Sequence, residues 1–266
     1  MSVEVTDRSY VVLGETFKRV TSVIDLAPKP WLGRWAAKAV AEAVVETWAA
    51  LHPLLSSGNA RQQQMAVSMM KGAPWTGTAA ELGRRVHAWV EDHVKGVRRG
   101  PDLDEDLLPY VEAFEHFIMD WKPTWVASER LVLHRELGYA GTIDVIAELP
   151  DLGRVLLDVK TGKSVYAEYA LQLAAYDRAT SEITPWGEER AFQGPGKALV
   201  VHLHHDGTYS LHPVDIGDAV FEAFKALLAL SEWSEVTSKR VVKSPIRPST
   251  GRANSAEETE LEIVIP

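Results

Sequence analysis

The sequence contains no cysteine among its 266 residues. This absence excludes disulfide bonds, metal sites built from thiolates, iron–sulfur clusters held by cysteine, and cysteine nucleophiles. Any metal site in this chain must therefore use ligands other than thiolate.

The chain also lacks a long apolar run and an N-terminal targeting pattern. No segment approaches the roughly 20 apolar residues needed to cross a bilayer, and Met1 to Asp7 lacks the basic-then-apolar order of a signal peptide. We therefore expect a cytoplasmic protein with no membrane partner. The 46% hydrophobic composition is enough for a substantial core, and one domain is the simplest expectation.

Basic residues are in deficit, with 28 Lys and Arg against 37 Asp and Glu, so the formal net charge is −9. This balance argues against a general polyanion binder, because phosphate contacts need local Lys and Arg. Local basic pairs remain, among them Arg84-Arg85 and Lys160 with Lys163, and the default interpretation of each is a solvated surface.

Residues Tyr10 to Phe17 alternate around Gly14-Glu15 and predict a short hairpin. Helical periodicity then dominates the chain up to Lys122, and short β-branched segments follow it. We expect an α/β (α+β) fold with a small mixed sheet flanked by helices. The predicted domain covers residues 1–245, with a mainly helical extension over 1–77 and the core over 78–245. Residues 246–266 are rich in Pro, Ser, Thr, Arg and Glu, which predicts a flexible tail.

Two predicted strands, residues 139–149 and 154–160, carry the residues that point to a chemistry. Side chains alternate along a strand, so Asp158 and Lys160 project from one face while Val159 takes the other. If the two strands pair as a hairpin, Asp144 can point the way Asp158 does. The expected result is two carboxylates and one ammonium group together.

Two aligned carboxylates without a thiolate suit Mg²⁺ or Mn²⁺, and a nearby Lys can orient a water molecule. Phosphodiester hydrolysis needs these parts. An isolated Asp-x-Lys is most often a salt bridge at a strand end, so the assignment depends on its neighbours. His202, His204 and His205 are close in sequence, but no spaced second pair accompanies them, and a zinc site is not indicated.

The neighbours form an ordered pattern: Gly141-x-x-Asp144, Asp158-x-Lys160 and Gln172-x-x-x-Tyr176, preceded by the helix segment Gly83-Arg-Arg-Val-His87. This combination resembles the PD-(D/E)XK nuclease superfamily, specifically its RecB-type exonuclease branch, and most of all the phage-encoded exonucleases of that branch. The resemblance covers residues 78–176 and implies a restriction-endonuclease-like core.

The resemblance implies a role for each matching residue. Asp144 and Asp158 would be metal ligands, assisted by the main-chain carbonyl of Val159 and by His87. Lys160 would orient the attacking water and offset charge on the scissile phosphate, so Asp144, Asp158 and Lys160 form the implied catalytic set. The implied cofactor is Mg²⁺ or Mn²⁺, as two ions.

Other residues are expected to support the site or to bind nucleic acid. By the resemblance, Gln172 and Tyr176 would hold the DNA strand, and Glu129 would be a supporting carboxylate. Lys163 and Arg84 are candidate phosphate contacts from their positions alone.

The sequence departs from several members of this branch, which carry four cysteines for an iron–sulfur cluster. Without cysteine, no such cluster is expected here. The resemblance implies a DNA exonuclease acting at a free end in phage or bacterial DNA recombination, repair or replication, with proteins of those processes as partners. The alternatives are a structure-specific endonuclease on the same fold and a non-catalytic DNA-binding member.

Overall fold

The structure is a computed structural model that describes residues 3–28, 30–72, 78–97 and 103–246. The residues 247–266 of the expected tail lie outside the described part. Contacts divide the chain into a compact unit, Met1–Ser231, and a second unit, Glu232–Pro266. In the second unit, the π-helix Trp233–Thr237 is followed by α9, Ser238–Val241.

A mixed sheet of ten strands forms the centre of the first unit. The strands are β1 Glu4–Val5, β2 Ser9–Val12, β3 Glu15–Arg19, β4 Thr124–His134, β5 Tyr139–Leu149, β6 Gly153–Lys160, β7 Ser181–Ile183, β8 Glu189–Ala191, β9 Ala198–Leu203 and β10 Tyr209–Val214. Along one path the order is β1-β2-β3-β5-β4-β7-β8, and β6, β9 and β10 extend from β5 in that order.

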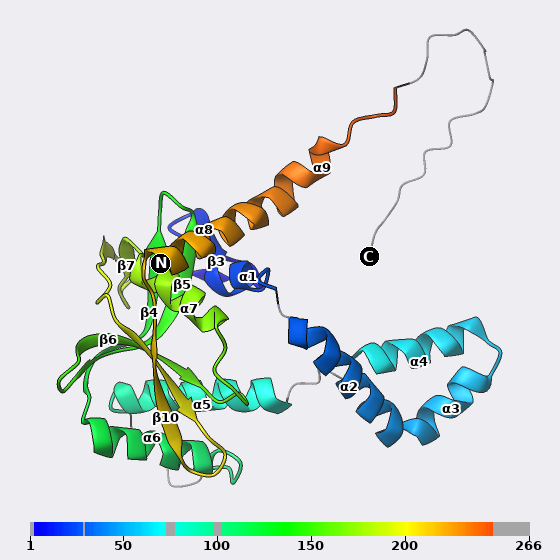
Figure 1. Cartoon of the computed structure of the whole chain (residues 1–266), viewed down its shortest axis with the longest axis horizontal. Helices are drawn as coiled ribbons and strands as arrows, with labels where there is room; N and C mark the ends of the chain where they lie inside the picture. Colours follow the sequence, from blue (N-terminus) through cyan, green and yellow to red (C-terminus); the bar gives the residue numbers. More distant parts are fainter. Residues whose placement is uncertain (1–2, 29, 73–77, 98–102, 247–266) are drawn as a thin grey trace. The chain divides into compact units, whose positions relative to one another are not determined.

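Five helices cover the two faces of this sheet: α1 Val20–Ile24, α5 Thr78–Val94, α6 Leu108–Trp121, α7 Glu168–Asp177 and α8 Asp218–Glu232. The other helices of this unit are α2 Pro30–Glu46, α3 Trp48–Ser56 and α4 Ala60–Gly72. Residues of α1, α7 and α8 share one hydrophobic cluster with the sheet, while residues of α5 and α6 share another. The predicted mixed sheet flanked by helices is confirmed, although the sheet is larger than expected (Figure 1).

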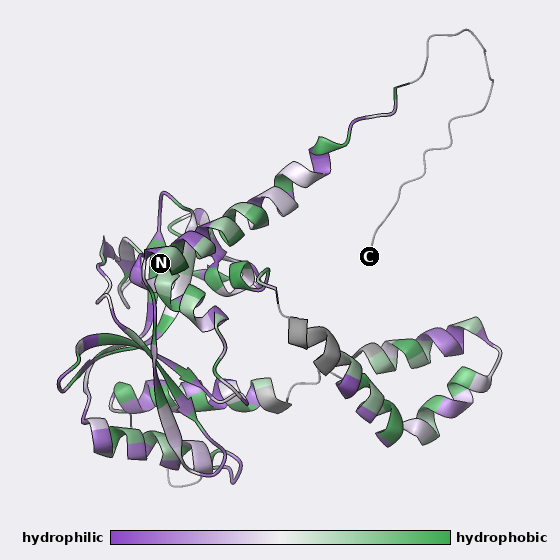
Figure 2. Cartoon of the chain, in the orientation of Figure 1, coloured by the Kyte–Doolittle hydropathy of each residue, from purple (hydrophilic) through white to green (hydrophobic). Residues whose placement is uncertain are grey.

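Amphipathic sequence explains why α5 and α6 lie against the sheet. Val86, Val90 and Phe114 are buried, whereas Arg84 and Glu115 are exposed. Figure 2 shows polar and hydrophobic residues alternating along both helices, as expected for helices with one buried face. Within the described ranges, no helix combines the length and the apolar character needed to cross a membrane.

Strand β6 is buried on both faces because it lies between β5 and β9. Leu156 on one face and Leu157 on the other are both almost fully buried. A central strand of this kind reads as a continuous apolar run, which Val155 to Val159 does apart from Asp158. An acid inside such a run is costly, so Asp158 must have compensating contacts.

The hairpin that the sequence predicts over Tyr10–Phe17 is confirmed as the pairing of β2 with β3, and it joins the main sheet. Strand β3 pairs in parallel with β5, with Lys18 opposite Tyr139 and Arg19 opposite Ala140. Phe17 is buried in a cluster that also contains Ala140. Residues 10–24 therefore contribute to the sheet's core.

Helices α2, α3 and α4 contact one another. The side chain of Asn59 accepts hydrogen bonds from the backbone N–H groups of Arg61 (2.9 Å) and Gln62 (3.3 Å), so it caps the start of α4.

Candidate active site

Three neighbouring strands carry one carboxylate each at the same level. Val145 pairs with Leu157, which places Asp158 of β6 level with Asp144 of β5. On the other side of β5, Ser128 pairs with Val145 and Arg130 pairs with Ile143, so Glu129 of β4 also lies level with Asp144. We call Asp158, Asp144 and Glu129 the carboxylate row.

The carboxylate row lies where one edge of β5 changes its pairing partner from β6 to β3. One edge of β5 pairs with β6 from Val145 to Leu149 and with β3 at Tyr139 and Ala140. Asp144 is the first residue beyond the paired stretch with β6, and its Oδ2 accepts a hydrogen bond from the backbone N–H of Val159 (2.9 Å). A side chain therefore joins the two strands where their backbone pairing ends.

Asp158 is a buried acid with one unsatisfied oxygen. Its side chain is only 2% exposed; Oδ1 accepts hydrogen bonds from Lys160 Nζ (2.7 Å) and Gln172 Nε2 (3.2 Å), and Oδ2 has no hydrogen-bond partner. Burial raises the pKa of Asp158 to about 6, the charge of Asp144 adds to the rise, and Lys160 opposes it. A buried carboxylate oxygen without a partner is suited to a cation or a proton.

Lys160 is held between charges and an aromatic ring. Burial alone would lower its pKa, but the negative charges of Asp158 and Asp144 outweigh burial and raise it. Its Nζ lies 4.8 Å from the centre of the Tyr169 ring, on α7. The ammonium group is thus charged and fixed in position.

Helix α7 supports the row through Gln172 and Tyr176, which lie one turn apart. Both side chains are buried, and the Gln172 amide is bound to Asp158. A Cβ at Gly141 would lie 2.3 Å from Tyr176 Cε1, so the Tyr176 ring occupies the space that a larger residue 141 would need. Burial, then the charges of Asp144 and Asp158, hold the pKa of Tyr176 well above its usual value.

The ligand atoms of His87, Glu129 and Asp144 lie within 4.8 Å of one another, close enough to hold one metal ion. His87 reaches this group from α5, with its Nδ1 3.4 Å from Asp144 Oδ2. Two carboxylates and one imidazole, with the free Asp158 Oδ2 on the neighbouring strand, fit Mg²⁺ or Mn²⁺.

Glu129 has unusual features for a residue in a strand. Its φ is 47°, a left-handed conformation that is uncommon outside glycine. Although the residue is exposed, desolvation around its carboxylate and then the charge of Asp144 raise its pKa to about 7. A carboxylate crowded by a second one gains from a bound cation.

The remaining predicted residues have varied surroundings. Lys163 is exposed on the loop after β6, and exposed Arg84 forms a salt bridge with Glu81. Val159 is fully buried. The structure brings His87, Asp144, Asp158, Lys160, Gln172 and Tyr176 together, and it leaves Lys163 and Arg84 at the surface.

Two features of the site go beyond the sequence prediction. Helical spacing places Tyr169 on the same face as Gln172 and Tyr176, but it did not predict that the Tyr169 ring lies beside Lys160. Glu129 was expected only as a supporting carboxylate, whereas it shares the ligand group with His87 and Asp144. Its position depends on strand pairing and a left-handed backbone, neither of which the sequence reveals.

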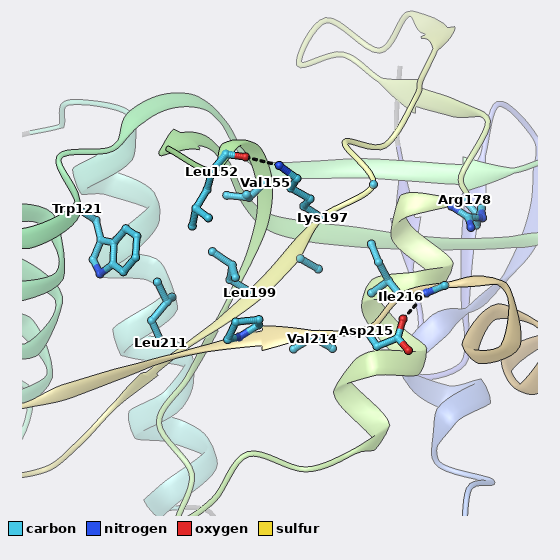
Figure 3. A pocket seen from close by; sticks show the side chains of 14 residues that line it. Trp121, Leu152, Val155, Arg178, Lys197, Leu199, Leu211, Val214, Asp215 and Ile216 are labelled. Carbon is cyan, nitrogen blue, oxygen red and sulfur yellow. Dashed lines mark hydrogen bonds between the residues drawn. The ribbon is translucent and has the colours of Figure 1, made fainter. Parts of the chain in front are cut away.

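A separate cavity of about 510 Å³ lies near the opposite end of β6, at Leu152 and Val155 (Figure 3). Its lining is mostly apolar, and Lys197 Nζ donates to the carbonyl oxygen of Leu152 (2.7 Å). Asp158 and Lys160 do not line this cavity. It is therefore distinct from the carboxylate row.

Comparison with protein-family models and with curated proteins finds no match for this sequence. Among solved structures, the chain is similar to an alkaline exonuclease, LHK-Exo, from Laribacter hongkongensis, with 12% sequence identity and a TM-score of 0.36 over 78% of this chain and 93% of that chain. It is also similar to SSO0001, with 16% identity and a TM-score of 0.31 over 68% of each chain. Likenesses this low assign neither a family nor an activity to this chain.

Proposed function

We propose that this chain is a metal-dependent DNA exonuclease with a PD-(D/E)XK site. The observation that carries the proposal is the buried pair of Asp158 and Lys160, with the unsatisfied Asp158 Oδ2, beside the ligand group His87, Glu129 and Asp144. An ordinary surface salt bridge would leave both partners solvated, whereas here the side chain of Asp158 is 2% exposed and that of Lys160 is 18% exposed.

The donor set assigns the residues that would hold Mg²⁺ or Mn²⁺. These are His87, Glu129, Asp144 and Asp158, together with the carbonyl of Val159 by resemblance. When bound, such an ion polarises the phosphodiester and stabilises the negative charge that develops on it.

The protein side chains would contribute positioning and charge. Lys160 would donate hydrogen bonds to the attacking water or to a phosphate oxygen, and its charge would offset the charge of the transition state. Gln172 fixes Asp158, which in turn fixes Lys160. We retain Gln172, Tyr176, Lys163 and Arg84 as proposed contacts to DNA; the burial of Gln172 and Tyr176 favours a positioning role in the free protein.

The net charge of −9 opposes DNA binding without divalent ions. We therefore propose that affinity for DNA depends on the metal. DNA recombination, repair or replication in a phage or bacterium is the proposed setting, by resemblance alone.

The test is digestion of end-labelled linear single-stranded and double-stranded DNA with Mg²⁺, with Mn²⁺ or with a chelator. We expect metal-dependent release of short products from the ends and resistance of covalently closed single-stranded circles. Rapid cleavage of the circles would favour the endonuclease alternative. Metal-dependent binding without hydrolysis would favour a non-catalytic member.

A further inference from the structure

A row of histidine and serine side chains lies beside Lys160 on the same face of the sheet. Lys160 pairs with His202 of β9, and His202 pairs with Ser210 of β10. His212 lies two residues from Ser210 on β10, so their side chains share one face. His204 directly follows the end of β9, and its ring lies against that of His202, with 4.3 Å between the ring centroids. We call His202, His204, Ser210 and His212 the histidine–serine row.

Hydrogen bonds connect the members of this row. The hydroxyl of Ser210 lies 3.1 Å from His204 Nε2 and 2.8 Å from His212 Nε2. His202 Nε2 lies 2.6 Å from the carbonyl oxygen of Gly162. Because a carbonyl only accepts, His202 must donate this N–H, which fixes its ring against the loop that follows Lys160.

The row lines a cavity of about 630 Å³, and Ser164 and Tyr166 of that loop line it too. Among the described lining residues, Asp215 alone carries a carboxylate, and its Oδ1 accepts a hydrogen bond from Gly217 N–H (2.8 Å). Imidazole, hydroxyl and phenol groups can all donate hydrogen bonds. The chain as a whole has a net charge of −9, whereas this lining has one carboxylate and several hydrogen-bond donors, which suits an anion.

A metal ion fits the row less well. Among the described residues, His87, Glu129 and Asp144 form the one group of three with ligand atoms within 4.8 Å of one another. In the row, nitrogens of His202, His204 and His212 are already engaged by Gly162 and Ser210. Because the Ser210 hydroxyl has one proton, it can donate to only one of these two imidazoles, and that ring then carries its own proton on Nδ1, from which it can donate to an anion.

The distance from Lys160 suits an extended nucleic acid strand. Neighbouring strands lie roughly 4.8 Å apart, so β9 is one spacing and β10 two spacings from Lys160. The cavity thus begins next to the proposed site of hydrolysis and leads away from it. A strand bound at the metal site would pass a neighbouring nucleotide over this cavity.

We propose that the histidine–serine row is a second phosphate subsite, which holds a phosphate of the nucleic acid beside the bond that is cut. This inference rests on the proposed function and extends it, because it identifies how the substrate strand leaves the carboxylate row. The subsite acts in binding, so its loss should raise KM and leave kcat little changed.

The test compares the unaltered protein with His204→Ala/His212→Ala in steady-state hydrolysis of an end-labelled single-stranded oligodeoxynucleotide with Mg²⁺. We expect KM to rise by about 10-fold and kcat to stay within about 2-fold, from the loss of hydrogen bonds to a charged group. His212→Gln, which keeps an N–H donor, should restore most of the affinity. His205→Ala is the matched control, because His205 is exposed and does not line the cavity.

An unchanged KM in the double variant, an equal rise in the His205→Ala control, or a fall in kcat alone would overturn the subsite. The single variant Ser210→Ala, on edge strand β10, gives the same test if the double variant fails to fold. Hydrolysis by the unaltered protein with no effect of the variants would reject only the subsite. No hydrolysis and no Ca²⁺-supported oligonucleotide binding by the unaltered protein would reject the proposed function, and the subsite with it.

Discussion

Asp158 combines burial with an oxygen that has no partner, and both features cost stability in the metal-free protein. Its pKa is raised from 3.8 to about 6 in the folded state, mainly by burial. The folded protein therefore keeps this proton to a higher pH than the unfolded chain does. The contribution of Asp158 to stability must then fall as pH rises through this interval.

We expect the metal-free protein to lose about 3 kcal/mol of unfolding free energy relative to Asp158→Asn between about pH 4 and pH 6. The variant lacks this titration, while Glu129 titrates in both proteins and cancels in the comparison. Urea unfolding at a series of pH values, with a chelator present, measures the difference. Parallel pH profiles for the two proteins would show that Asp158 is not a strained buried acid.

Gly141 leaves space for the ring of Tyr176, which packs closely against it. Because an added Cβ would lie 2.3 Å from Tyr176 Cε1, we expect Gly141→Ala to cost about 1–3 kcal/mol. Gly162→Ala is the control, since nothing lies within 4 Å of a Cβ there. Denaturant unfolding of both variants checks the prediction, and equal stabilities would contradict the packing of Tyr176 on Gly141.

Among the helices and strands, the site depends on the position of α5 beside β5, at the point where the pairing of β5 with β6 ends. Helix α5 places His87 within reach of Asp144, and β4 supplies Glu129 from the other side. His87→Ala should weaken Mn²⁺ binding by at least about 10-fold. Loss of a residue that only orients a metal ligand already costs about 10-fold or more in affinity, and His87 is proposed to be a ligand itself. Isothermal titration calorimetry measures the affinity.

The control for this prediction is His205→Ala, which removes an exposed histidine outside the ligand group. Equal Mn²⁺ affinity in His87→Ala and in the unaltered protein would remove α5 from the metal site.

Local sequence patterns predicted which residues share a face within one strand or helix better than they predicted the contacts between different elements. Strand alternation was enough to align Asp158 with Lys160, and helical spacing was enough to align Gln172 with Tyr176. The position of the histidine–serine row beside Lys160 was not predictable, because it depends on the non-local pairing of β9 with β6. The contact of Gln172 with Asp158 likewise depends on how α7 packs on the sheet.

In the molecule as a whole, the sheet pairs strands that are far apart in sequence. Strand β3 pairs with β5 about 120 residues later, and no local pattern in residues 15–19 indicates this partner. The mixed sheet with flanking helices was predictable from periodicity, while its ten-stranded extent was not. Non-local pairing is the physical reason for the difference.

Phe17 tests whether the N-terminal strands are part of the core. We expect Phe17→Ala to cost about 3–5 kcal/mol, because this side chain is almost fully buried. Val5→Ala, at an exposed position of β1, should change stability by less than about 0.5 kcal/mol. Thermal or urea unfolding distinguishes the two, and a neutral Phe17→Ala would separate residues 4–19 from the folded core.

We expect the carboxylate row and Lys160 to hydrolyse DNA with a divalent ion. The most direct measurement is the initial rate of product release from end-labelled linear DNA with Mg²⁺ or Mn²⁺, for the unaltered protein, Asp158→Asn and Lys160→Ala. We expect metal-dependent hydrolysis that falls at least about 100-fold in both folded variants. Full activity in either variant, or no hydrolysis by the unaltered protein with either metal, would contradict it.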